Sequence, residues 1–205
     1  MASSLNLAGV FTDALAQHIA IIRQLESQQD SFERAAILIT DSLLAGNKIL
    51  WCGNGGSAAD SQHLAAELVG RFRRMRSGLS SIALTSDTSV LTAVANDFGY
   101  DEVFERQVEA LCHSGDVVVG ISTSGNSRNI CAAVEKAHEL GAVTVAMTGQ
   151  GGGTLAGLAD VSIRVPSTDA ARIQEAHILC GHILCEWIEI ATCITHAVAA
   201  HGGAE

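Results

Sequence analysis

The chain has 205 residues, of which 48% are hydrophobic and one is proline, and its formal net charge is −10 at pH 7. This composition excludes a disordered polypeptide, and the length predicts one domain over residues 1–205. The negative charge argues against non-specific binding to nucleic acid or to a membrane surface, and no apolar run approaches the roughly 20 residues that span a bilayer.

Two amphipathic helices are predicted in the first part of the chain. Apolar residues recur at helical spacing from Leu5 to Gln28, and a second helical pattern runs from Ser31 to Leu44. No linker separates these segments from the rest of the chain. We expect residues 1–46 to form a helical hairpin that packs on the same domain or on a partner chain, followed by an α/β core over residues 47–205.

From residue 48 onward, short apolar segments alternate with helical patterns. Strands are predicted at 48–52, 81–85, 116–121, 142–147 and 161–165. Helices are predicted at 58–67, 89–95, 101–111, 128–140 and 170–197, with a turn at 96–100. Apolar strands that alternate with helices indicate a three-layer α/β/α fold around a five-stranded parallel sheet. In such sheets, ligands bind beyond the carboxyl ends of the strands.

The first predicted strand ends in the glycine-rich turn Gly53–Ser57. A glycine-rich loop that leads into a helix is an anion site, because free backbone N–H groups converge where the helix dipole is positive. The stretch also fits the dinucleotide pattern G-x-G-x-x-A, but Arg73–Arg76 stand where the acidic ribose partner would be. We therefore favour phosphate over a dinucleotide, and no Gly-Lys-Ser/Thr P-loop is present.

A second loop, Ser122–Ser127, follows the clearest predicted strand. Its hydroxyl and N–H groups precede a helix, which suits a phosphate monoester. The alternative is an ordinary helix cap by Ser127. Two such loops at strand ends favour the phosphate interpretation.

Polar side chains on two predicted helices are the candidates for chemistry. His63 and Glu67 lie four residues apart and share a helix face, although such pairs are more often only solvated. Gln174 and His182 lie on the last helix, about 12 Å apart along its axis at 1.5 Å per residue. Binding of one ion by both would need stretched side chains, a helix that starts after Gln174, or two subunits.

The last helix is apolar on two sides, which favours burial of one side by a partner subunit. The stronger stripe is Ile173, Leu179, Cys180, Ile183, Leu184, Trp187 and Ala191, and the weaker one is Ile178, Gly181 and Cys185. The basic segment Arg71–Arg76 follows another helix end, where compensation of the helix dipole or contact with an anion is favoured over nucleic-acid binding.

The six cysteines lie in apolar segments without CxxC spacing. We interpret them as small buried hydrophobes rather than a disulfide framework or a thiolate zinc site. The N-terminus also lacks the pattern of a signal peptide, so a cytoplasmic location is expected.

Five stretches, in this order, resemble the phosphoheptose isomerases, which are members of the sugar isomerase (SIS) domain family: CGNGGSAADSQHLAAEL (52–68), LTAVANDFGYDEVF (91–104), GDVVVGISTSGNSRNI (115–130), MTGQGGG (147–153) and RIQEAHILCGHIL (172–184). The resemblance implies the SIS fold and a homotetramer with active sites between subunits. It also implies interconversion of sedoheptulose 7-phosphate and D-glycero-D-manno-heptose 7-phosphate, which leads to ADP- or GDP-heptose for cell-surface glycans such as lipopolysaccharide.

Carried over by motif, the resemblance assigns roles to individual residues. Glu67 and His182 would be the catalytic acid/base pair, and zinc would be held by His63, Glu67, Gln174 and His182. Substrate contacts would come from Asn54, Gly55, Gly56, Ser57, Glu67, Asn96, Asp97, Ser122, Thr123, Ser124, Ser127 and Gln174. Histidine, carboxylate and amide groups are plausible zinc ligands, although glutamine is uncommon.

Two other functions remain open from the sequence. Non-enzymatic SIS relatives bind the bacterial replication initiator and lack the groups at Glu67 and His182, which this chain keeps. A regulator that senses sugar phosphates would bind the ligand without forming product. The chain departs from the family at Arg76–Ser81, which lacks the usual prolines, and the tail Thr195–Glu205 has no trusted match.

Overall fold

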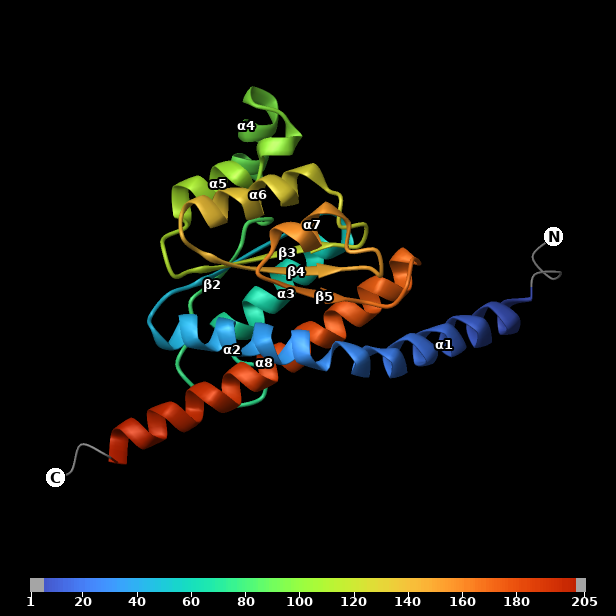
Figure 1. The fold of residues 1–205 in the computed structure, drawn as a ribbon, viewed down its shortest axis with the longest axis horizontal. Helices are drawn as coiled ribbons and strands as arrows, with labels where there is room; N and C mark the ends of the chain where they lie inside the picture. Colours follow the sequence, from blue (N-terminus) through green and yellow to red (C-terminus); the bar gives the residue numbers. More distant parts are fainter. Residues whose placement is uncertain (1–5, 202–205) are drawn as a thin grey trace.

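Five parallel strands form the centre of the molecule (Figure 1). The computed structural model describes residues 6–201, with the backbone alone for 195–201. The sheet order is β2-β1-β3-β4-β5. The strands are β1 (Ile49–Gly53), β2 (Ser81–Ala83), β3 (Val117–Ser122), β4 (Val143–Thr148) and β5 (Val161–Arg164). The predicted five-stranded parallel sheet is therefore confirmed.

Helices cover both faces of this sheet. One face carries α2 (Gln29–Leu44), α3 (Gly56–Val69) and α8 (Ala170–His201). The other carries α5 (Glu105–Leu111), α6 (Arg128–Glu139) and α7 (Gly153–Leu158), with α4 (Thr88–Asp97) at the end of that layer (Figure 1). Each central strand is buried on both sides, because alternate residues enter alternate cores: Trp51 packs towards α3 and α8, and Leu50 towards α5 and α6.

The N-terminal helices are present, but they do not form the expected hairpin. The first helix, α1 (Leu7–Gln24), continues through a 3₁₀ turn at Leu25–Gln28 into α2. Gln24, Leu25 and Gln29 keep right-handed helical backbone angles, and Gln28 departs from them with φ −101° and ψ 7°. The chain does not turn back on itself here, and α1 extends away from the sheet (Figure 1). Leu5, where the helix was expected to begin, lies outside the described residues. The pattern of apolar residues marks helices but does not reveal the angle between them.

One local expectation also needs correction. Asn96 and Asp97 lie in the last turn of α4 rather than in a turn. The short helix α7 was not predicted, since its start depends on distant groups: Leu155 N–H donates to the carbonyl of Gly125. On α8, the side buried within the chain is centred on Ala176, Cys180, Leu184 and Ile188. Ile183 and Trp187 of the stronger apolar stripe are 44% and 47% exposed, so their coverage by a partner subunit stays a prediction.

The long helix α8 is a core helix with polar groups inside it. By length and composition alone, Ala170–Ile194 could span a membrane, with a mean hydropathy of 1.3. However, 44% of its most apolar window is buried inside the protein, and α8 packs on α3 and α2. His177 and Glu189 are fully buried on it. Because α8 packs on α3 and α2 and buries these two polar side chains, it is part of the domain core.

Four of the six cysteines are buried as the sequence predicts, whereas Cys131 and Cys193 are only partly buried. All six are free thiols, and Cys52, Cys112, Cys180 and Cys185 are buried. Burial raises the pKa of Cys52 and Cys185 to about 12, so both thiols stay protonated and act as small apolar groups.

His177 gives the fold a predictable response to acid. Burial lowers the pKa of His177 from 6.5 to about 4, and its contact with the carbonyl of Thr148 at 3.2 Å offsets part of that shift. The folded state thus favours neutral His177. The resulting contribution to the free energy of unfolding is present above pH 6.5 and is lost as the pH falls towards 4. Between pH 7 and 4, the wild type should lose up to about 3 kcal/mol more unfolding free energy than His177→Gln. Urea unfolding across this pH range measures the difference, and equal losses would contradict it.

Candidate functional site

The predicted ligand loops meet at the carboxyl edge of the sheet. β1 pairs with β2 on one side and with β3 on the other, so the strand order reverses between β1 and β3. Ligands in open α/β sheets bind at such switch points. The two loops that follow these strands are Gly53–Ser57 and Ser122–Ser127, and Gly53 is the register partner of Ile121. The topology therefore places both predicted phosphate loops side by side.

The first loop is a tight turn at the start of α3. Gly55 has φ +56°, a left-handed conformation that glycine adopts without strain, and it precedes the first helical residue. A Cβ on Gly56 would lie 2.5 Å from the side-chain amide nitrogen of Gln174, so α8 closes this turn from one side. Ser57 is 2% exposed, and its carbonyl accepts the hydroxyl of Ser61. Ser57 is thus buried at the turn, and its predicted contact with the substrate stays a prediction.

The second loop gathers three hydroxyl groups. Ser122 Oγ lies 3.0 Å from Ser127 Oγ and 3.5 Å from Ser124 Oγ, and it accepts the N–H of Gly125 at 3.2 Å. The alternative helix-cap role is not observed, because the Ser127 side chain makes no capping bond to α6. Thr123, between Ser122 and Ser124 in the sequence, is half-buried. Convergent hydroxyls at a helix N-terminus are suited to a phosphate group.

An amide pair joins the two loops. Asn54 Nδ2 donates to Asn129 Oδ1, and Asn129 Nδ2 donates back to Asn54 Oδ1, both at 2.9 Å. The Tyr100 hydroxyl donates to the same Asn54 oxygen at 3.0 Å. These contacts fix the orientation of Asn54 at the switch point. The sequence did not single out Asn129 or Tyr100, because their role depends on a contact between distant segments.

A histidine–glutamate cluster lies further along α3, where α8 crosses it. His63 Nε2 lies 2.8 Å from His182 Nε2 and 3.4 Å from Glu67 Oε1, and the three candidate ligand atoms lie within 4.8 Å of one another. Gly181 allows the close crossing, because a Cβ there would lie 2.5 Å from the buried side chain of Leu64. The structure thus joins residues 119 positions apart that spacing could not connect.

The cluster is suited to a metal ion, but Gln174, one of the four predicted ligands, lies apart from the other three. Donors around tetrahedral zinc lie about 3.3 Å apart, since Zn–N bonds are about 2.0 Å. The distance of 3.4 Å between His63 and Glu67 is close to this spacing, that of 2.8 Å between His63 and His182 is shorter, and all three atoms lie within 4.8 Å of one another. Gln174 instead contacts Gly56, about 10 Å along α3 from His63 at 1.5 Å per residue. A helix start after Gln174 is excluded, because α8 begins at Ala170.

Asn96 and Asp97 also lie apart from the cluster. Asn96 Nδ2 donates to Asp97 Oδ1 at 2.7 Å, and this pair is exposed. Figure 1 places α4 at the end of the molecule away from α8. Within one chain, these two side chains therefore do not join His63, Glu67 and His182, and their substrate contacts stay predictions.

Asp60 lies one turn before His63 on α3 and was not predicted. Burial raises the pKa of Asp60 to about 6, although the nearby charge of His63 partly lowers it. Its Oδ2 atom is buried and has no hydrogen-bond partner among the described residues. Asp60 is therefore a second carboxyl group at the cluster, in addition to Glu67.

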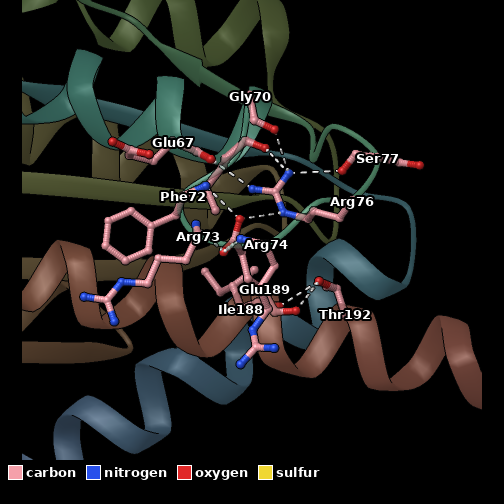
Figure 2. Close-up of polar contacts among 11 residues, drawn as sticks. Glu67, Gly70, Phe72, Arg73, Arg74, Arg76, Ser77, Ile188, Glu189 and Thr192 are labelled. Atoms are coloured by element: carbon pink, nitrogen blue, oxygen red, sulfur yellow. Dashed lines mark hydrogen bonds and ion pairs between the residues drawn. The ribbon is translucent and has the colours of Figure 1, made fainter.

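The basic segment contacts an anion inside the protein (Figure 2). The backbone N–H groups of Phe72, Arg73 and Arg74 donate to the carboxylate of Glu189 at 2.7 to 3.0 Å. Arg76 donates to main-chain carbonyls at the end of α3, including that of Glu67 at 2.9 Å. The segment therefore makes both predicted kinds of contact, with an anion and with the carbonyl end of a helix.

Comparison with known proteins agrees with this geometry. The sequence profile of the SIS domain matches residues 15–149. The chain is 50% identical to the phosphoheptose isomerase of Aliarcobacter butzleri over 182 residues, which are 89% of this chain and 96% of that protein. It is 57% identical to that of Aquifex aeolicus over 156 residues, 76% and 82% of the two chains. The structure of the phosphoheptose isomerase from Neisseria gonorrhoeae superposes with a TM-score of 0.85 at 45% identity, covering 90% of this chain and 99% of that one.

Proposed function

Because the chain belongs to the SIS domain family, and within it to the phosphoheptose isomerases, we propose that it interconverts sedoheptulose 7-phosphate and D-glycero-D-manno-heptose 7-phosphate. The observation that carries this proposal is the meeting of Glu67, His63 and His182 between α3 and α8. An aldose–ketose shift needs a base for the carbon-bound proton and an acid for the oxygens, and a carboxylate with an imidazole supplies both.

The proposed mechanism divides the proton transfers between two side chains. Glu67 removes the proton from C1 of the ketose and returns it to C2 through an enediol. His182 carries the proton between the two oxygens. The loop Ser122–Ser127 binds the phosphate, and Asn54, held by Asn129 and Tyr100, orients the sugar. Fixing both ends of the sugar aligns C1 and C2 with Glu67, which lowers the entropic part of the barrier.

Zinc is the proposed cofactor, because three candidate ligand atoms of the types that bind zinc lie within 4.8 Å of one another. His63, Glu67 and His182 of one chain would hold the ion, and Gln174 would require a second copy of the chain to join them. Bound zinc would act as a Lewis acid that stabilises negative charge on the substrate oxygens.

Removal of the metal should therefore stop the reaction. Chelation with EDTA is expected to lower kcat by at least about 100-fold, and added zinc should restore it. His63→Ala should show the same loss of kcat, and EDTA should not lower the kcat of this variant further. Full activity of a chain shown by elemental analysis to be metal-free would contradict the zinc assignment.

A homotetramer is proposed for the assembly, with active sites between subunits. Its support is the apolar surface of α1, where Leu7, Val10 and Phe11 are 64% to 76% exposed and Leu15 and Ile19 about half exposed. Exposed apolar surface of this extent indicates a protein partner. We further propose a cytoplasmic location, one SIS domain over residues 1–205, and supply of heptose for ADP- or GDP-heptose and cell-surface glycans.

The deciding experiment is incubation of the purified chain with sedoheptulose 7-phosphate and detection of the aldose by NMR. Formation of D-glycero-D-manno-heptose 7-phosphate supports the enzyme. Binding without product would instead support a sugar-phosphate sensor, and capture of the replication initiator by an inactive chain would support the non-catalytic relatives. The presence of both Glu67 and His182 favours the enzyme.

A further inference from the structure

The buried carboxylate of Glu189 on α8 binds the basic segment Arg71–Arg76, which follows α3. Glu189 lies seven residues after His182, so the two residues lie two turns apart on nearly the same side of the helix. Its side chain is 1% exposed. Oε1 accepts the N–H of Phe72 at 2.7 Å, and Oε2 accepts those of Arg73 and Arg74 at 2.8 and 3.0 Å (Figure 2). Three consecutive backbone donors thus converge on one side chain.

Arg76 completes this arrangement from the same segment. Its Nε lies 3.3 Å from Glu189 Oε1, and its side chain is 5% exposed. Its Nη atoms donate to the carbonyls of Glu67, Leu68, Gly70 and Ser77, which include the last turn of α3 (Figure 2). Burial would raise the pKa of Glu189, but the three N–H bonds and the charge of Arg76 outweigh it and lower the pKa. Glu189 is therefore a stable anion that links α8 to the segment holding the end of α3.

Phe72, the second residue of the basic segment, reaches the candidate active site. The Phe72 ring stacks on the imidazole of His182, with the ring centroids 5.3 Å apart and the planes 19° apart. His182 also meets His63 edge to face at 5.0 Å. Because Glu189 accepts the Phe72 N–H, its carboxylate fixes the backbone that carries this ring. A continuous set of contacts runs from Glu189 through Phe72 to His182.

From this geometry we infer that Glu189 is a positioning residue for the isomerase reaction, acting through Phe72 to hold the His182 ring in its reactive orientation. The inference rests on the proposed function. A purely structural carboxylate would stabilise the fold without affecting turnover by folded protein. A positioning carboxylate also affects kcat, because a shift of about 1 Å in a reacting group can cost up to about 100-fold in rate.

The test is Glu189→Gln, which keeps the shape but turns an amide NH₂ towards donors. Folded Glu189→Gln, judged by circular dichroism and oligomer size, should lose roughly 10- to 100-fold in kcat with little change in KM. The matched control is Glu186→Gln, one turn earlier on α8, where the carboxylate pairs with Arg73 at the surface at 2.8 Å. This control should keep the wild-type kcat. A kcat for Glu189→Gln indistinguishable from the control would overturn the inference.

Phe72→Leu provides a second variant that leaves the Glu189 carboxylate and its backbone donors in place. It should lower kcat similarly, and the double variant should be no worse than Glu189→Gln alone, because both act through one contact. If Glu189→Gln does not fold, Phe72→Leu alone decides, and an unchanged kcat overturns the inference. Multiplicative losses in the double variant would also overturn it.

A spectroscopic measurement separates this inference from the proposed reaction. The ring current of Phe72 should shift the His182 ring protons, which are assigned by their absence in His182→Gln. Both Glu189→Gln and Phe72→Leu should move these resonances, whereas Glu186→Gln should not. This measurement needs no substrate, so a wild-type chain that forms no aldose would refute the proposed function, whereas unmoved His182 resonances would refute the positioning role.

Discussion

Glu67→Gln and His182→Gln should each abolish turnover of sedoheptulose 7-phosphate while leaving the fold intact. Loss of a general acid or base costs about 10²- to 10⁴-fold in rate, and here each residue is also a proposed metal ligand. Glu67 is only 22% exposed at its side chain, and its glutamine replacement has the same shape, so the packing of α3 should survive. The measurement is kcat by NMR detection of the aldose, with circular dichroism as the check on folding.

The two variants also distinguish the roles of the residues. In the proposed mechanism, Glu67→Gln should stop exchange of the substrate C1 proton with deuterated water, since that proton transfer needs the carboxylate. His182→Gln should allow some C1 exchange to persist while product formation fails. The control Glu186→Gln, on the exposed side of α8, should leave both unchanged. Retained isomerase activity in either variant would refute its catalytic assignment.

Gly125→Ala is expected to have the second largest effect, on the phosphate loop. Gly125 has φ +67°, and a Cβ there would lie 2.0 Å from the carbonyl oxygen of Gly152, which is backbone and cannot move aside easily. Left-handed strain and overpacking together should cost about 2 to 5 kcal/mol of unfolding free energy. Displacement of Ser122–Ser127 should also raise KM for the sugar phosphate more than it lowers kcat.

The matched control for this variant lies in the neighbouring loop. A Cβ on Gly151 would have no atom within 4 Å, and Gly151 has no positive φ, so Gly151→Ala should change neither stability nor KM. Urea unfolding and steady-state kinetics measure both quantities. A Gly125→Ala chain as stable as the control, with unchanged KM, would show that the close approach of the two loops is not needed.

Much of the fold could be predicted from residues that are adjacent in sequence. The strand at Val117–Ser122 and the turn at Gly53–Ser57 follow from apolar runs and glycine chemistry, which depend on local backbone and burial preferences. The short helix α7 could not be predicted, because its first N–H groups are held by Gly125 and Asn126 of another loop. The angle between α1 and α2 likewise could not be predicted from the pattern of apolar residues.

The candidate site also combines features that are local in sequence with contacts that depend on the tertiary structure. The serine loop and the shared face of His63 and Glu67 are local features, since a strand end and a four-residue helical spacing define them. The Asn54–Asn129 pair depends on the meeting of two loops at the sheet edge. No spacing rule links such residues, because the distance between them is set by how β1 and β3 pair.

The sequence alone determined the class of fold, the loops suited to phosphate and the identity of the family, because these depend on local patterns and on motifs in order. Only the tertiary structure decided that His182 meets His63 within one chain, that Gln174 turns instead to Gly56, and that the basic segment binds Glu189. The physical reason is that helix crossing is set by packing: Gly181 admits Leu64, and that close contact places the two histidines together.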